Sequence, residues 1–171
     1  MASLMLTGVM TLGLFAGCSK DASQSSTSGG SKDSIVIATM SETPSLSPTD
    51  HNAVAGSYMN ILTYNTLFRG DMDLKPVPEL VDTYENTSDT EWVFYLRQGV
   101  KFHDGSEMTA DDVVASIEYA KTCPEVNLYN GSVEKIEKVD DYTVKITTPG
   151  PSAILLNDLC HRSQEAAGRR S

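Results

Sequence analysis

The stretch 91–118, EWVFYLRQGVKFHDGSEMTADDVVASIE, predicts a strand, a turn and a helix in immediate succession. Residues 91–96 alternate aromatic and branched side chains in the way that is typical of a strand. Gly99 permits a sharp bend, after which the chain extends again. Asp104 and Gly105 then predict a tight turn, because glycine accepts a positive φ and aspartate bonds nearby backbone. The stretch therefore predicts one structural unit.

A helix start follows the turn. Thr109 is the predicted N-cap, and Asp112 falls at the capping-box position in the first turn, where the helix dipole favours negative charge. Apolar residues then recur at helical spacing at Val113, Ile117 and Ala120, which predicts one apolar helix face. The residues assigned to the core by this pattern are Trp92, Phe94, Leu96, Phe102, Val113 and Ile117.

Further elements are predicted on both sides of this stretch. A β-branched run at 34–39 predicts a first strand, and 53–68 carries Val54, Tyr58, Ile61, Leu62 and Leu67 at helical spacing. Two hairpins are predicted, one pairing 84–86 with 91–96 and one pairing 133–139 with 142–147. A short helix is predicted within 153–159. The predicted fold class is α+β.

Length and charge limit the function. A chain of 171 residues suffices for one domain with a sizeable core but not for two large lobes. The formal net charge of −10 argues against nucleic acid, whose phosphates require clustered Lys and Arg. We therefore expect no nucleic-acid partner.

The N-terminal residues predict an exported protein. The apolar run at 4–15 is shorter than the roughly 20 residues of a bilayer span and suits the core of a signal peptide. Ala16-Gly17-Cys18 resembles the lipobox of bacterial lipoproteins, although Phe15 stands where Leu is usual and no Lys or Arg precedes the run. We expect Cys18 to be lipidated and the signal peptide to begin upstream of Met1. A cleaved secretory leader with an incidental cysteine is the alternative.

No catalytic constellation is found in the sequence. His103-Asp104 lacks the further ligands of a metal hydrolase, so we interpret the pair as a strand-end histidine beside a turn aspartate. Ser116 falls inside a predicted helix rather than at a nucleophile elbow. Cys123 and Cys160 have no metal or catalytic spacing, and they remain either thiols or a disulfide. We expect no enzyme, no metal site and no cofactor.

The order W-x-F-x-L-R-x-G-V-K-F-x-D-G, followed by T-A-x-D-V-x-x-S, is similar to the family 5 extracellular solute-binding proteins, the peptide and nickel receptors of bacterial ABC importers. Ser45-Leu46-Ser47-Pro48 and Pro78-Glu79-Leu80 extend the resemblance over 34–159. Ser47 and Val81 depart from the usual S-L-D-P and P-x-L-A. The resemblance implies a substrate-capturing receptor, with oligopeptides as ligands and ABC permease subunits as partners. It also implies a place in the cell envelope, either lipid-anchored at the outer face of the cytoplasmic membrane or periplasmic.

The resemblance further implies which residues line the ligand cleft. In the family the chain just after the S-L-x-P turn lines it, and so does the segment after the long helix. Here these positions are His51, Asn52, Ala53, Val54 and Tyr129. Each of them is alternatively an ordinary loop or core residue. The family's anchor for a peptide amine lies in a later lobe.

The predicted organisation has four parts: a lipoprotein signal peptide at 1–17, the lipidated Cys18 with a Ser/Gly-rich tether at 18–33, part of a solute-binding domain at 34–160, and a disordered or aberrant tail at 161–171. Since family members are much longer, we expect an N-terminal fragment of a type II-like periplasmic binding protein. That fragment would hold the first strand of lobe I and a small mixed α/β subdomain of an incomplete two-lobe fold. A naturally short domain with a disordered tail is the alternative.

Two other functions remain open. A nickel, haem or sugar receptor of the same family is one of them. The other is a surface lipoprotein that acts as an adhesin or signalling co-receptor, which would bind a protein partner without a small ligand.

Overall fold

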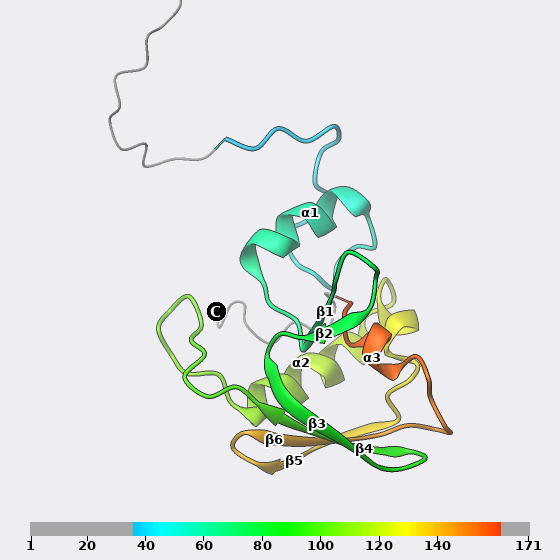
Figure 1. The fold of residues 1–171 in the computed structure, drawn as a ribbon. Helices are drawn as coiled ribbons and strands as arrows, with labels where there is room; N and C mark the ends of the chain where they lie inside the picture. The colour runs from blue at the N-terminus through cyan, green and yellow to red at the C-terminus, as the bar shows by residue number, and fades with distance from the viewer. Residues whose placement is uncertain (1–35, 162–171) are drawn as a thin grey trace, which may run out of the picture. The chain divides into compact units, whose positions relative to one another are not determined.

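The larger sheet of the described chain is four-stranded and antiparallel with the order β3-β4-β6-β5, and it lies along the lower edge of the view in Figure 1. The computed structural model describes residues 36–161. The strands are β3 (Val81–Ser88), β4 (Glu91–Leu96), β5 (Lys135–Asp140) and β6 (Thr143–Thr147). Both predicted hairpins are confirmed, since β3 pairs with β4 and β5 with β6. The hairpins join through β4 and β6, where Phe94 lies opposite Val144.

The register gives the sheet one apolar face and one charged face. Trp92 lies opposite Ile146, and Ile136 lies opposite Ile146 from the other side, so these side chains share a face. On the opposite face the ammonium of Lys145 lies 3.4 Å from Glu91 and 3.7 Å from Glu137. One packed and one solvated face is the usual arrangement of an antiparallel sheet.

Helix α2 (Ala110–Thr122) packs on the apolar face through Ala110, Val113, Ile117 and Ala120. Its predicted N-cap is confirmed, because Asp112 Oδ2 accepts hydrogen bonds from the Thr109 N–H at 2.8 Å and from the Thr109 hydroxyl at 3.0 Å. The carboxylate thus satisfies a backbone donor at the helix start and favours the dipole.

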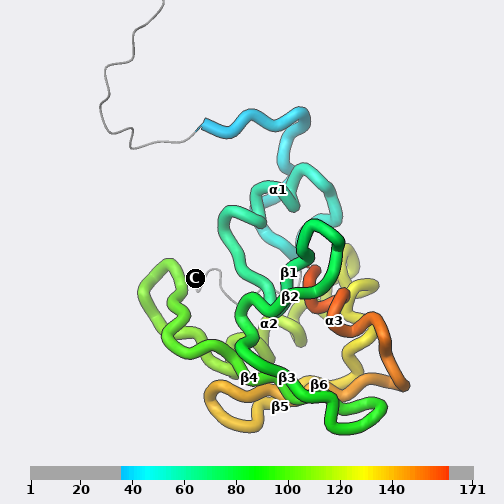
Figure 2. Tube along the Cα trace, in the orientation of Figure 1, coloured from blue at the N-terminus to red at the C-terminus, as the bar shows by residue number. Residues whose placement is uncertain are grey.

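The two predicted turn glycines both adopt positive φ. Gly99 has a φ of 73° and Gly105 a φ of 88°. At the second turn Asp104 Oδ1 accepts the Ser106 N–H at 2.8 Å, so the aspartate bonds nearby backbone as predicted. The tube in Figure 2 shows the segment between β4 and α2 leaving the sheet as a long loop.

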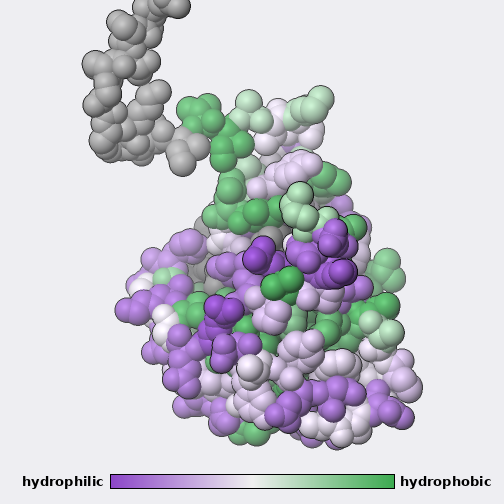
Figure 3. Space-filling model, viewed as in Figure 1, coloured by the Kyte–Doolittle hydropathy of each residue, from purple (hydrophilic) through white to green (hydrophobic). Residues whose placement is uncertain are grey.

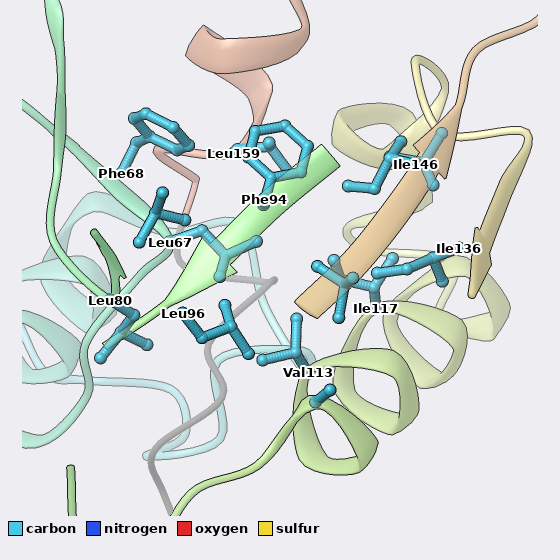
Figure 4. Packing of buried hydrophobic residues seen from close by; sticks show 14 of the residues in the cluster. Leu67, Phe68, Leu80, Phe94, Leu96, Val113, Ile117, Ile136, Ile146 and Leu159 are labelled. Carbon is cyan, nitrogen blue, oxygen red and sulfur yellow. The ribbon is translucent and has the colours of Figure 1, made fainter. Parts of the chain in front are cut away.

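The core lies between the apolar sheet face, α2 and the segments around β1 and α3 (Figure 4). Five of the six predicted core residues are buried: Phe94, Leu96, Phe102, Val113 and Ile117. Trp92 is half-buried at the rim, where its ring stacks on Tyr84 and Phe94. The remaining buried members of the cluster are Leu67, Phe68, Leu80, Val81, Met108, Ala110, Val133, Ile136, Val144, Ile146, Leu155 and Leu159.

Two short strands and a short helix complete this core. Strand β1 (Phe68–Gly70) pairs with β2 (Pro76–Pro78), and α3 (Leu155–Asp158) lies beside β1. The Phe68 N–H donates to the Leu159 carbonyl at 3.3 Å. The short helix predicted near the C-terminal end is therefore confirmed.

The helix predicted over 53–68 is shorter than expected. Helix α1 spans Val54–Thr63, and the chain is extended from Tyr64. Glu79 accounts for the early end, because its Oε2 accepts the Thr66 N–H at 2.8 Å. That bond holds the following residues in an extended path, so Leu67 and Phe68 enter the core from outside the helix.

The predicted first strand at 34–39 is wrong for its described part. Residues 36–39 form no regular structure, and Val36 and Ile37 are exposed. β-branched residues favour a strand chiefly through contacts with cross-strand neighbours, and no strand of the described chain pairs with this one. Cys18, the leader, the tether and 162–171 lie outside the described residues. No helix between 36 and 161 has the length and hydrophobicity needed to cross a membrane.

Candidate functional site

The loop that enters α1 holds His51 in a buried position. Its imidazole lies directly over Gly56, where an added Cβ would overlap the ring. The ring Nδ1 accepts the Ala53 N–H at 3.2 Å. Helix and backbone together therefore fix the orientation of this side chain.

Asn52, the next residue, is exposed and contacts a distant part of the chain. Its Oδ1 accepts a hydrogen bond from the Tyr129 hydroxyl at 3.1 Å, although the two residues are 77 positions apart. Tyr129 belongs to the 3₁₀ helix η1 (Asn127–Asn130), which packs against α2. The Tyr129 ring also stacks on His161, with centroids 3.6 Å apart and planes at 9°.

A small pocket of about 120 Å³ lies beside these contacts. Burial and the nearby Glu79 carboxylate raise the pKa of the Cys160 thiol, which donates to the Leu156 carbonyl at 3.2 Å. Both Cys160 and Cys123 are free thiols. The pocket is lined by Pro48, His51, Asn52, Ser57, Asn60, Cys160 and His161.

The structure brings together four of the five predicted cleft residues. His51 and Asn52 line the pocket, Ala53 bonds the His51 ring, and Tyr129 bonds Asn52. Val54, next to Ala53, makes none of these contacts, and its side chain is exposed on α1.

Sequence reasoning missed Asn60 and His161. A signal for Asn60 was available, since Gly56 and Asn60 are four residues apart and so share one helix face. Both are buried, which makes this the packed face of α1. No local pattern pointed to His161, the first residue of the segment predicted as a tail.

A second hollow, of about 640 Å³, opens at the end of the sheet near the turn between β5 and β6. It contains none of the predicted site residues, and its walls include Asp82, Arg97 and Asp140. Beside it the Tyr142 hydroxyl donates to Glu107 Oε1 at 2.7 Å, a bond that holds the pKa of Glu107 below its usual value with help from the Gly99 N–H. No buried polar atom that lacks a partner in the described chain faces this hollow. We therefore place the candidate site at the small pocket lined by His51 and Asn60.

His103 and Asp104 make separate structural contacts. His103 Nε2 donates to the Thr63 carbonyl at 2.9 Å and so ties the loop after β4 to the last residue of α1. Asp104 bonds Ser106 within its own turn. Within residues 36–161 no group of three His, Cys, Asp or Glu side chains is placed to hold a metal ion.

Comparison with known proteins identifies the relatives of this chain. The family model described as bacterial extracellular solute-binding proteins, family 5 Middle, matches residues 75–168. The glutathione-binding protein GsiB of Pectobacterium atrosepticum is 37% identical over 131 residues, which is 74% of this chain and 25% of that protein. GsiB of Salmonella typhimurium is 34% identical over 132 residues, with 74% and 26% covered. The chain thus spans about a quarter of the length of the curated relatives that it matches.

Solved structures share the fold. The agropinic acid complex of the binding protein AgaA from A. tumefaciens R10 has a TM-score of 0.65 at 31% identity, with 72% of this chain and 26% of that chain covered. The substrate-binding domain of an oligopeptide ABC transporter from Bacillus anthracis has a TM-score of 0.66 at 23% identity, with 72% and 28% covered. The second likeness bears on the fold alone.

Proposed function

Because the chain belongs to family 5 of the bacterial extracellular solute-binding proteins, we propose that it forms part of the solute-capturing receptor of an ABC importer. Oligopeptides and peptide-like solutes are the proposed ligands, since the relatives that match by sequence are named for glutathione, itself a tripeptide. The proposed partners are the importer's permease subunits.

The observation that carries this proposal is the hydrogen bond between Asn52 and Tyr129. It joins the loop before α1 to the segment after α2, which are the two segments proposed to line the ligand cleft. We use the term "receptor wall" for the surface formed by residues 51–54 and Tyr129. Asn52 and Val54 are exposed, so a solute can reach them. Tyr129 adds an aromatic ring with a polar tip, a common feature of small-molecule sites.

A chimera tests the receptor wall. The matching quarter of the Pectobacterium atrosepticum relative would be replaced by residues 38–161 of this chain, and peptide binding would be measured by calorimetry. We expect binding, and we expect Asn52→Ala and Tyr129→Ala each to weaken it about tenfold, which is about 1.4 kcal/mol. Tyr119→Ala is the matched control, because Tyr119 is an exposed tyrosine on α2. Undiminished affinity in both wall variants would refute the proposed wall.

We also propose that the receptor is held at the cell envelope by lipid on Cys18. The apolar run at 4–15, the small residues before Cys18 and the polar tether after it support this. Expression with an intact leader, detergent partitioning and N-terminal mass spectrometry test it. We expect a diacylated Cys18 and loss of membrane association in Cys18→Ser. Recovery of unmodified Cys18 in the aqueous phase would count against lipidation.

A further inference from the structure

Two residues that line the small pocket beside α1 each carry a buried polar atom without a partner in the described chain. His51 is 8% exposed and Asn60 is 2% exposed, and both line the pocket. His51 Nε2 and Asn60 Oδ1 have no hydrogen-bond partner among the described residues. Leaving a buried polar group without a hydrogen bond is unfavourable, so two such groups on one pocket indicate that something else completes them.

The contact at the other ring nitrogen fixes which atom of His51 carries the proton. Nδ1 lies 3.2 Å from the Ala53 nitrogen, whose N–H can only donate. Nδ1 must therefore present its lone pair, and in a neutral imidazole the proton is then on Nε2. His51 accordingly offers an N–H donor to the pocket, while Asn60 offers a carboxamide oxygen, which is an acceptor.

Two neighbouring residues, Cys160 and Gly56, allow His51 and Asn60 to bind an occupant of the pocket. The Cys160 thiol is already bonded to the Leu156 carbonyl, so it does not compete for either atom. Gly56 provides the space in which the ring lies, because any Cβ there would displace the imidazole. The donor and the acceptor are thus held on the pocket wall by the loop and by α1.

We propose that this pocket binds a neutral polar group that accepts a hydrogen bond from His51 Nε2–H and donates one to Asn60 Oδ1. A water molecule meets this requirement, as does the hydroxyl or primary amide of a solute. A carboxylate has no proton to give Asn60, and an ammonium has no lone pair for His51. The pocket therefore rejects the charged ends of a peptide. This site shares His51 with the proposed receptor wall, but the proposal rests on the pocket atoms and not on the receptor function.

The size of the pocket agrees with a small occupant. Its volume is about 120 Å³. Sites for drug-sized ligands are typically about 300–1,000 Å³, so this one accommodates a single functional group rather than a whole peptide. A pocket of this size and polarity also meets the requirements for ordered water.

Three probes of similar size and different charge test the proposal on the full 171-residue chain. Acetamide both donates and accepts, acetate only accepts and ethylammonium only donates. Each would be titrated while the side-chain ¹H–¹⁵N signals of His51 and Asn60 are followed by NMR. A high-resolution crystal structure would show any occupant. Two variants test the donor. His51→Gln keeps an amide N–H near the Nε2 position, whereas His51→Leu removes the donor.

We expect the native spectrum to show a protonated Nε2 and an unprotonated Nδ1. Shifts of the His51 and Asn60 signals with acetamide alone would support a solute group as occupant, provided that the Asn60 shift is retained in His51→Gln and lost in His51→Leu. Unresponsive signals together with crystallographic density bonded to both atoms would support water. A proton on Nδ1, an empty pocket in the crystal, or shifts with acetate or ethylammonium as large as those with acetamide would overturn the proposal.

Discussion

The sheet with α2 and the segment around α1 bury opposite kinds of side chain. In the first region Phe94, Ile117 and Val144 are fully buried against one another. In α1 the buried residues are Gly56 and Asn60. Its large apolar residues form an exposed stripe, defined by Val54, Tyr58, Ile61 and Leu62. Figure 3 shows hydrophobic residues at the surface in the part of the view where α1 lies.

The two regions are therefore stabilised by different interactions. The sheet and α2 complete their own core, so hydrophobic burial holds them together. Helix α1 is tied to the rest by polar contacts, including those of Thr63 with His103 and of Asn52 with Tyr129. The residues of the apolar stripe are 53–69% exposed. We expect exposed apolar surface of this kind to favour association.

The largest expected effect contrasts isoleucines from the two regions. Ile117→Ala should lower the free energy of unfolding by about 2–5 kcal/mol, because it empties a fully buried site. Ile61→Ala should change it by less than about 0.5 kcal/mol, since the side chain is 53% exposed. Urea denaturation of the full chain measures both. Equal losses would remove the distinction between the regions.

A smaller effect is expected at the helix starts. Asp112→Ala removes the carboxylate that caps α2 and should cost about 1 kcal/mol in urea denaturation. Glu118→Ala, at an exposed position in the same helix, is the control and should stay within about 0.5 kcal/mol. Helix α1 has no such cap, because its N-cap is Ala53. An unchanged stability in Asp112→Ala would mean that the cap contributes nothing.

The apolar stripe should affect association rather than stability. We expect the chain to self-associate, and the double variant Ile61→Lys, Leu62→Lys to reduce that association with little change in unfolding free energy. Sedimentation velocity measures it. Glu118→Lys is the control because it alters the net charge by the same amount. The added lysines reduce the net negative charge and so weaken the electrostatic repulsion between molecules. This weaker repulsion would favour association, which is the opposite of the expected result. Unreduced association in the double variant would exclude the stripe as its cause.

The smallest effect concerns the hydrogen bond between the partly buried Tyr142 and the exposed Glu107. The Tyr142 hydroxyl lowers the pKa of the Glu107 carboxyl, so the ionised form is favoured in the folded state. The resulting stabilisation is present above the unfolded-state pKa and is lost as the pH falls through the folded-state pKa. Tyr142→Phe should raise the Glu107 midpoint toward its ordinary value in a ¹³C NMR titration. A midpoint that does not move would show that the hydrogen bond has no such effect.

Local patterns predicted the sheet and α2 well, because their determinants lie close together in the sequence. The cap at Thr109 needs only Asp112, and the turn glycines need only their own backbone freedom. The pairing of β4 with β6 was not predictable, since it is fixed by packing between distant hairpins. Trp92 was placed in the core by its alternation, yet it lies at the edge of the cluster.

Sequence patterns around α1 were less informative, because its small and polar residues are buried while its large apolar residues are exposed. Helical spacing identified the helix but not the face that packs. The contact of Asn52 with Tyr129 joins two segments that the family resemblance had selected separately, and no periodicity would have paired them. Asn60 was missed because an asparagine inside a helix gives no apolar signal, and only its four-residue spacing from Gly56 pointed to a shared face.

The most direct test of the proposed receptor wall is calorimetry of the 171-residue chain with a mixed library of tri- to pentapeptides. The proposed wall is a single surface, and a peptide laid on it remains largely solvated. The few desolvated contacts then do not outweigh the cost of ordering the peptide. We predict no measurable binding by this chain, in contrast to the chimera. A dissociation constant below about 10 μM, which corresponds to about −7 kcal/mol, would contradict this and identify a self-sufficient binding module.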